Sequence, residues 1–434
     1  MHVNRTAATL VIVALVTACR GDGPRPAAQA PSAADHAAGA RHESTAVAVA
    51  AARAVDTSTP PQPDTAQASA PARRPAPIRH VPQPATVRAL YVNRAAARGD
   101  AVWNLVALAR NSAVNALVFD VKDDQGLVLY RSTVSLAHMI GADTTQPMPA
   151  RHLHALMDSL RRYHIYPIAR IAVARDPVLA MRRPQWGLVH RSGDAERNAW
   201  VDPRHREVWA YAADLASEAV ARGFSEVLFA DARFPDSRGQ PELLELTSTD
   251  GRTRSQVIRD QLGFLNERVS PLGVPMAVDV NGLAAVDSSD LNSGQRWEML
   301  ADRADVLAPT MFPGRFPPGT LGFTNPGARP GDAVGRALAA ARRRSDALRD
   351  AARIVPWYQA FGAGAAPIDA ADVRAQIAAG EAEGFHSWML WNPDSRYREE
   401  FWRDTASAKP AKPKPSKSKP PAKVSGRAGG RSRR

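Results

Sequence analysis

Between Val87 and Asp404 the chain alternates short apolar runs with longer segments of mixed polarity. The short runs are rich in β-branched and aromatic residues, which is typical of strands. They lack regular polar alternation, so both faces of each strand are expected to be buried, as in a parallel sheet. The predicted strands are Val87–Asn93, Ala116–Val121, Ile165–Val173, Glu226–Asp231, Pro275–Val280, Asp305–Thr310, Arg353–Tyr358 and Ser387–Trp391.

A segment with helical spacing of apolar residues follows each predicted strand. Eight strand–helix pairs in about 320 residues favour an α/β fold closed into a (β/α)8 TIM barrel with enlarged loops, rather than an open doubly wound sheet. No Gly-rich dinucleotide turn follows the first strand, and the sequence contains no P-loop. The predicted helices are Ala101–Asn111, Arg151–Tyr163, Pro203–Arg222, Arg254–Val269, Gly294–Ala301, Asp332–Ala351, Asp369–Glu383 and Tyr397–Thr405.

Residues 1–18 have the pattern of an export signal: Arg5 precedes the apolar run Ala7–Ala18, which is too short to span a bilayer comfortably. The run ends in Val-Thr-Ala-Cys19, which resembles the lipobox of bacterial lipoproteins. That resemblance implies cleavage before Cys19 and lipidation of its sulfur and its new amino terminus. The alternative is an ordinary secretory signal with an incidental Cys. Arg20 follows Cys19, and the sorting habit of Gram-negative lipoproteins then favours the outer membrane.

Two low-complexity segments flank the predicted barrel, which we assign to residues 86–405. Residues 19–85 are rich in Ala, Pro, Ser and Thr and predict a disordered tether, because they cannot bury a core. Residues 406–434 form a Lys/Pro/Arg-rich tail, also predicted to be disordered. Cys19 is the only cysteine, so the mature chain is expected to lack a disulfide.

The formal net charge of +13 comes mostly from the tail. Basic and acidic residues balance between Thr86 and Asp404, so the fold carries no basic excess of the kind that nucleic-acid binding needs, and we predict no nucleic-acid partner. The tail is predicted to contact an anionic envelope polymer. A solvated tail without a partner is the alternative.

Seven short motifs occur in order along nearly all of the predicted barrel. The motifs are Asn115–Gly126, Ile168–Ile171, Trp200–Pro203, Arg233–Pro235, Gly294–Gln295, Pro356–Gln359 and Trp388–Pro393. Together they resemble the bacterial putative glycoside hydrolase domain family. The resemblance implies a TIM barrel related to glycoside hydrolases, without a proven reaction or an established catalytic pair.

The chain departs from the family pattern at two places. After the fourth strand the family usually reads Phe-Asp-Tyr-Val-Arg-Phe-Pro, whereas this chain has Ala230 at the carboxylate position and Asp231 at the Tyr position. Because side chains alternate along a strand, a shift by one residue is expected to turn the carboxylate away from the mouth. Near the sixth strand the family often reads Pro-Met-Val-Tyr-Pro-Ser-His, and here Phe312 and Arg315 replace the phenol and the imidazole.

Glycoside hydrolysis usually needs two carboxyl groups, one as acid and one as base or nucleophile. The candidates at the carboxyl ends of predicted strands are Asp120, Asp231 and Asp279, where a barrel builds its active site. Glu226 begins the fourth strand, at the opposite end. Two of the candidates also have a structural interpretation: Asp120 could be a buried ion pair with Lys122 or Arg170, and Asp231 could pair with Arg233.

The predicted substrate-binding residues share three kinds of chemistry. Buried cations need carboxylate partners and hold them ionised. Aromatic faces suit the apolar faces of sugar rings, and amides read hydroxyl groups. The candidates are Lys122, Arg170, Trp200, Asp202, Arg233, Gln295, Trp357, Gln359, Trp391 and Asn392.

Other chemistries find little support in the sequence. His-Glu-x-x-His, Cys-x-x-Cys and Gly-x-Ser-x-Gly motifs do not occur, and we predict neither a metal nor a cofactor. The first hypothesis is therefore a lipid-anchored glycoside hydrolase acting on a cell-envelope or extracellular polysaccharide. The alternatives are a carbohydrate-binding barrel that has lost its carboxylate geometry at Ala230, and an envelope scaffold whose basic tail grips an anionic polymer.

Overall fold

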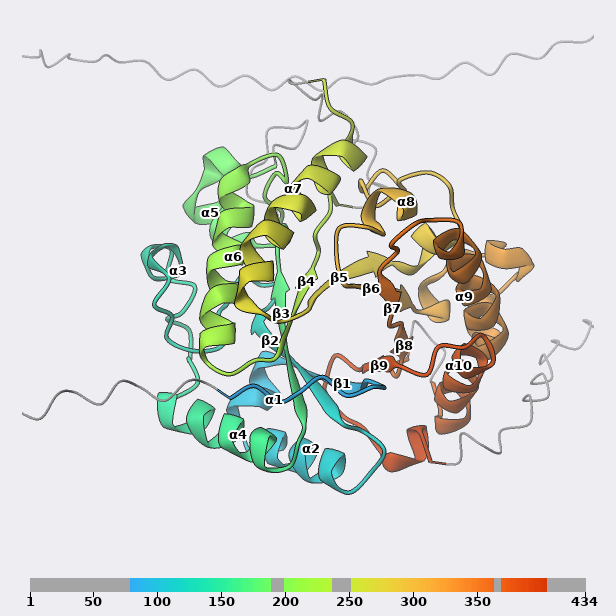
Figure 1. The fold of residues 1–434 in the computed structure, drawn as a ribbon, viewed down its shortest axis with the longest axis horizontal. Coiled ribbons are helices and arrows are strands. Elements are labelled where there is room, and N and C mark those ends of the chain that lie inside the picture. Colours follow the sequence, from blue (N-terminus) through green and yellow to red (C-terminus); the bar gives the residue numbers. More distant parts are fainter. Residues whose placement is uncertain (1–78, 189–198, 236–250, 363–367, 404–434) are drawn as a thin grey trace, which may run out of the picture. The chain divides into compact units, whose positions relative to one another are not determined.

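The strands of the computed structural model, which describes residues 79–188, 199–235, 251–362 and 368–403, form one parallel sheet that closes on itself (Figure 1). Its order is β5-β4-β3-β2-β1-β9-β8-β6, and β5 pairs with β6 to complete the barrel. The first and last strands, β1 and β9, lie side by side. The strands are β1 (Arg88–Val92), β2 (Ala116–Lys122), β3 (Tyr166–Ala172), β4 (Glu226–Ala230), β5 (Met276–Asn281), β6 (Val306–Met311), β7 (Arg353–Ile354), β8 (Trp357–Gln359) and β9 (Trp388–Trp391). The predicted TIM barrel is confirmed.

The seventh position of the barrel is filled by two short strands instead of the single predicted strand. β7 pairs with the first residues of β6, and β8 pairs with its last residues. Pro356 lies between them. Because proline has no backbone N–H to donate, it interrupts the ladder at this point. The two pieces together act as one barrel strand, so the closed sheet keeps eight positions.

Helices surround the strands on the outside of the barrel (Figure 1). Two of them begin at capping boxes, Thr253 with Gln256 and Asp369 with Asp372, in which each side chain bonds the other residue's backbone N–H. The helices are α1 (Arg94–Arg98), α2 (Ala101–Arg110), α3 (Ser135–Met139), α4 (Ala150–Arg162), α5 (Pro177–Arg182), α6 (Arg206–Ala221), α7 (Arg254–Val269), α8 (Trp297–Leu300), α9 (Pro330–Asp346) and α10 (Ala370–Ala382). Of the described residues, no helix is long and apolar enough to cross a membrane.

Two helix predictions need correction. The segment Gly294–Ala301 contains only the single turn α8, because Gly294 has a left-handed φ of 81°. The predicted helix Tyr397–Thr405 is wrong over its described part, which holds only a 3-10 turn at Glu399–Phe401. There the Tyr397 hydroxyl donates to the carbonyl of Leu390 and accepts from the N–H of Asn392, which fastens the segment to the end of β9.

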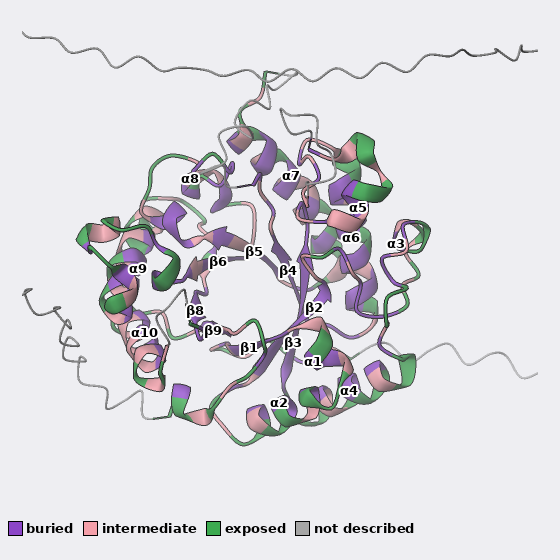
Figure 2. Ribbon diagram, turned by 180° about the vertical axis from the view of Figure 1, so that it is seen from behind, coloured by how far each residue is buried: buried purple, intermediate pink, exposed green. Residues whose placement is uncertain are grey.

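The apolar core has two layers, one inside the barrel and one between the strands and the helices. Figure 2 shows that the barrel strands are mostly buried, whereas the surrounding helices combine buried and exposed positions. On β2, Ala116 and Val118 face the interior, whereas Leu117, Phe119 and Val121 face the helices. This is the alternation of a strand with two buried faces. Apolar side chains fill the middle of the barrel interior. The polar groups inside the barrel that are described next lie at its two ends.

At the amino-terminal end of the barrel, the buried Glu226 accepts a hydrogen bond of 3.1 Å from the Gln83 amide. Burial raises the pKa of Glu226 to about 7, and Tyr166 is the first of the groups that oppose this effect. Glu226 is the first residue of β4 and therefore lies at the opposite end of the strand from the mouth, as the sequence indicated. The export signal, Cys19, the tether and the basic tail lie outside the described residues.

Candidate active site at the barrel mouth

Three charged residues, two of them buried and one partly buried, meet at the carboxyl ends of the barrel strands. Arg170 on β3 donates from Nη1 to Oδ1 of Asp120 on β2, at 2.7 Å. Its Nε lies 3.5 Å from Oδ2 of Asp279 on β5. One guanidinium therefore lies between two carboxyl groups. Burial alone would lower the pKa of Arg170, but Asp120 and Asp279 raise it overall, so the guanidinium stays charged.

Tyr91 on β1 completes the environment of Asp120. Its hydroxyl donates to Asp120 Oδ2, while Oδ1 takes the bond from Arg170, so both oxygens of this carboxylate are occupied. Asp120 is only 2% exposed. Burial raises its pKa to about 6, against the lowering effects of Arg170 and Tyr91. Burial and the adjacent Asp120 also raise the pKa of the Tyr91 phenol, so Tyr91 remains a donor.

Asp279 has a more open environment than Asp120. The indole of Trp357 on β8 donates to its Oδ1 at 2.6 Å. Its Oδ2 faces Arg170 at a distance beyond a good hydrogen bond, so this oxygen is free to hold a proton. Burial raises the pKa of Asp279 to about 7, and the nearby Asp231 adds to the rise against Arg170 and Trp357.

Asp231 lies just beyond β4 and has a left-handed backbone, with a φ of 48°. The preceding Ala230 points into the barrel interior and is fully buried. The Asp231 carboxylate accepts from Arg233 at 3.1 Å, and its charge is close enough to raise the pKa values of both Asp279 and Arg170. The structure thus differs from the expected outward turn, because the positive φ breaks the alternation of the strand.

Aromatic side chains form the opposite side of the mouth. Trp391 on β9 stacks on Tyr91 with ring centroids 3.8 Å apart and meets Trp357 edge-on at 5.5 Å. Phe312, just after β6, lies 6.5 Å from Trp391. The Arg170 guanidinium lies 4.9 Å from the Trp391 ring. Trp391 is only partly buried, whereas Trp357 is fully buried, so Trp391 is the better placed of the two to meet a sugar.

Three predicted residues lie on loops at the rim. The guanidinium of Arg233 lies 4.8 Å from the Trp200 ring. Asp202 is paired with Arg204 at 3.2 Å, just before α6. All three predicted residues are partly exposed, and they extend the rim from Asp231 toward the loop before α6.

The three predicted amide residues hold backbone groups. Gln295 accepts from the N–H of Asn281 and donates to the carbonyl of Asp279, which fixes the end of β5. Asn392 donates to the carbonyl of Ala360 at 2.7 Å. Gln359 is 4% exposed and accepts from the N–H of Gly314. These amides shape the mouth, and their bonds leave little for a substrate hydroxyl.

Lys122 is not brought to the mouth. Its ammonium lies 2.8 Å from Asp176 and donates to the carbonyl of Ala172, in the layer between strands and helices. A register shift against β3 between Asp120 and Lys122 separates the directions of the two side chains. Its assignment as a substrate-binding residue is therefore corrected, and the partner of Asp120 is Arg170.

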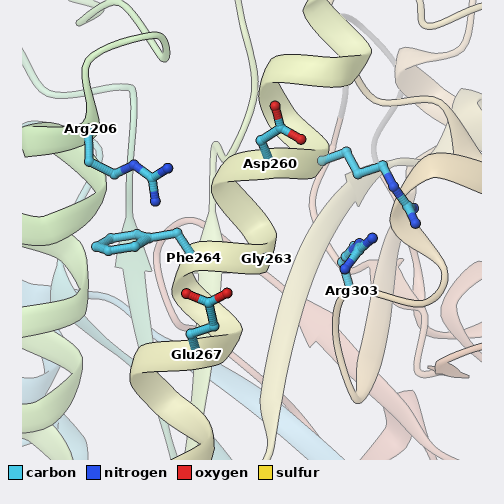
Figure 3. Close-up of a pocket in the computed structure, with 7 residues that line it drawn as sticks. Arg206, Asp260, Gly263, Phe264, Glu267 and Arg303 are labelled. Carbon is cyan, nitrogen blue, oxygen red and sulfur yellow. The ribbon is translucent and has the colours of Figure 1, made fainter.

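A separate recess of about 250 Å³ lies on the outer side of α7, away from the mouth residues (Figure 3). The ring of Phe264 forms part of it, with the Arg206 guanidinium 4.4 Å from the ring centroid. Arginines and carboxylates line it together, so no charge of one sign dominates. In the described part of the chain, no group of three His, Cys, Asp or Glu residues is arranged to hold a metal ion.

The sequence profile of a family described as "Putative glycosyl hydrolase domain" matches residues 89–397, which include every residue of the mouth. No curated protein matches the chain.

Among solved structures, the glycoside hydrolase domain of PgaB (BpsB) from Bordetella bronchiseptica is 17% identical, covers 72% of this chain and 95% of its own, and has a TM-score of 0.53. A hypothetical protein from Ruminiclostridium thermocellum is 27% identical over 44% of this chain and 97% of its own, with a TM-score of 0.38. The α-galactosidase TtGalA from Thermus thermophilus is 16% identical over 76% of this chain and 62% of its own, with a TM-score of 0.46. The similarity to the PgaB domain supports the barrel fold. The TM-scores of the other two structures are too low to add to this conclusion.

Proposed function

The chain belongs to the Putative glycosyl hydrolase domain family, and from this premise we propose that it hydrolyses glycosidic bonds of a cell-envelope or extracellular polysaccharide at the barrel mouth. One observation carries the proposal: Asp279 and Asp231 lie close enough to interact electrostatically beside the charged Arg170, and Asp279 has a pKa of about 7. Glycoside hydrolases need one carboxyl group that is protonated near neutral pH and one that is not.

Asp279 is the proposed general acid. Its Oδ1 is fixed by Trp357, and its Oδ2 makes only a long contact with Arg170. A proton on Oδ2 can therefore be given to the oxygen of the departing sugar. A pKa of about 7 keeps a substantial share of Asp279 protonated at neutral pH, which general acid catalysis requires.

Asp231 is the proposed base or nucleophile. It is a carboxylate near Asp279 with an exposed edge, since its side chain is 15% accessible and its Oδ1 pairs with Arg233. Asp120 is assigned a positioning role instead, because both of its oxygens are bonded and it is almost fully buried. Its hydrogen bond holds the Arg170 guanidinium in place beside Asp279.

Trp391 is the proposed stacking platform for the sugar. Tyr91 supports one face of its ring, and its partial exposure leaves area for a ligand. The Arg170 guanidinium lies 4.9 Å from the Trp391 ring, and its Nε lies 3.5 Å from Asp279, so a sugar on Trp391 would lie close to the carboxyl groups.

A carbohydrate-binding barrel without turnover is the second candidate. Ala230 is its supporting observation, because this inward-pointing position is where the family usually carries a carboxylate. In that case Asp231 would serve only to pair with Arg233 at the rim.

The proposed location follows from the sequence. Lipidation of Cys19 after export would anchor the barrel to the outer membrane through the tether, and the basic tail would contact an anionic envelope polymer. Both features would keep the barrel next to cell-envelope glycans.

The test is a screen of the full-length protein against bacterial envelope and extracellular polysaccharides, scored by newly formed reducing ends. Asp231→Asn and Asp279→Asn should each lower turnover by about two to four orders of magnitude, while glycan binding persists. Asp302→Asn, a surface carboxylate paired with Arg259, is the matched control and should retain full activity. Binding of a glycan with no turnover by the native chain would favour the binding barrel.

A further inference from the structure

The loop from Pro313 to Ala328 leaves β6 at the mouth and carries a single charged residue, Arg315. Arg315 is exposed, and its guanidinium lies 4.9 Å from the centroid of the Phe361 ring. Across the described residues, no carboxylate forms an ion pair with it. The chain from Val355 to Ile368, which includes Phe361, has no charged residue at all.

This cation is held in a defined place. The buried Gln359 accepts from the N–H of Gly314 at 2.9 Å and donates to the carbonyl of Phe361 at 2.9 Å. The Gln359 side chain thus joins the backbone of Gly314, next to Arg315, to the backbone of Phe361. Gln376 on α10 in turn bonds both backbone groups of Gln359. The Arg315–Phe361 pair is therefore preorganised by two buried amides.

A row of aromatic rings connects this pair to the proposed catalytic centre. Phe361 meets Phe312 edge-on with centroids 5.3 Å apart, and Phe312 lies 6.5 Å from Trp391. Phe312 and Phe361 are each only 9% exposed, so Trp391 is the ring of this row that is open to a sugar. A glycan that stacks on Trp391 and continues over the other two rings would reach Arg315 beyond the sugar that is cleaved.

The charges at the mouth indicate where an anionic group is tolerated. Three carboxyl groups, Asp120, Asp231 and Asp279, lie at the mouth and are paired there with Arg170 and Arg233. An extra anion at that position would meet repulsion. Arg315 offers the opposite environment, because it is an exposed cation over an aromatic ring and has no carboxylate ion-pair partner among the described residues.

We propose that Arg315 and Phe361 form a subsite for an anionic group of the glycan, so that the substrate is an acidic polysaccharide. The inference rests on the proposed function for the placing of the cleaved sugar at Trp391. The guanidinium would bind a carboxylate or a sulfate ester through charge-assisted hydrogen bonds, which are stronger than neutral ones.

The experiment is calorimetric binding of oligosaccharides to the full-length chain, in an Asp279→Asn background that prevents cleavage. The probes are oligogalacturonate and oligomannuronate, their carboxyl-reduced neutral counterparts, and a sulfated galactan oligomer. Arg315→Gln is compared with Arg110→Gln, a matched control in which an exposed arginine lies 4.8 Å from the Tyr163 ring on the outer helices. The basic tail is present in every variant, so its contribution cancels.

An acidic oligomer should bind about tenfold more tightly than its neutral counterpart, and Arg315→Gln, unlike Arg110→Gln, should lower that preference to the part contributed by the basic tail. A preference for uronates identifies a carboxylate, and a preference for the sulfated oligomer identifies a sulfate ester. No preference for any acidic probe, or a preference of the same size in Arg315→Gln and Arg110→Gln, overturns the subsite.

The same oligomers are then incubated with the chain that retains Asp279. If acidic oligomers bind preferentially through Arg315 but are not cleaved, the proposed hydrolysis is refuted and the subsite stands. Cleavage of neutral oligomers only, unaffected by Arg315→Gln, would refute the subsite and leave the hydrolysis.

Discussion

Replacing Asp279 by Asn is expected to make the free energy of unfolding less dependent on pH. Burial raises the pKa of Asp279 from the ordinary 3.8 to about 7. The folded chain therefore binds this proton more tightly than the unfolded chain does. The resulting stabilisation is fully present below the unfolded pKa and is lost as the pH rises through the folded pKa.

The magnitude follows from the size of the shift. One pKa unit corresponds to about 1.4 kcal/mol, so ionising Asp279 in the folded chain removes at most about 4 kcal/mol of stabilisation over the whole window. Between about pH 5 and about pH 8, the expected loss is about 2 to 3 kcal/mol. Asn cannot ionise at this position. Its amide faces Arg170 at every pH, so any cost of that contact is a constant offset.

The assay is urea unfolding of wild type and Asp279→Asn at both pH values. Wild type should lose about 2 to 3 kcal/mol more than the variant on going to the higher pH. Other buried acids such as Asp120 and Glu226 act in both proteins and cancel in this comparison. Asp302→Asn is the control, because the hydrogen bond from Arg259 lowers the pKa of Asp302, which is then ionised in both states throughout this range. Parallel pH dependences for wild type and Asp279→Asn would refute the assignment of a raised pKa.

Three further substitutions test other parts of the account. Tyr91→Phe removes a hydrogen bond to the Asp120 carboxylate, so the pKa of Asp120 should rise above about 6 in a carboxyl-carbon NMR titration, and an unchanged pKa would show that the bond has no influence. Trp391→Ala should weaken glycan binding about tenfold in a calorimetric titration, with a smaller effect on kcat, and unaltered affinity would exclude Trp391 as the stacking platform. Cys19→Ala should leave the protein without lipid and soluble in the periplasm by cell fractionation, whereas a membrane-bound variant would refute the anchor.

The barrel was predictable because parallel strands are buried on both faces and stand out as continuous apolar runs. The break at Pro356 was missed because β7 and β8 are joined without a polar interruption. The predicted helix after Tyr397 failed because hydrogen bonds of the Tyr397 hydroxyl to distant strand ends outweigh local helical spacing. Such bonds depend on the closed fold and leave no local pattern.

Part of the mouth was also predictable, since Asp120, Arg170 and Asp279 are polar residues inside apolar strands. Tyr91 was missed because a tyrosine in a strand reads as core, although its place two residues after Ala89 puts it on the inward face. The positive φ of Asp231 and the register shift before Lys122 changed the direction of two charged side chains. Neither backbone feature can be recognised from residue type alone.

The most direct test of the proposed mechanism is the leaving-group dependence of Asp279→Asn. The variant and the wild type are compared on two substrates with the same sugar, one with a sugar leaving group and one with a dinitrophenyl leaving group. A good leaving group departs without protonation, so the loss of a general acid should cost about two to four orders of magnitude on the glycan and almost nothing on the aryl glycoside in the bond-cleaving step. Equal losses on the two substrates would contradict the assignment of Asp279 as the general acid.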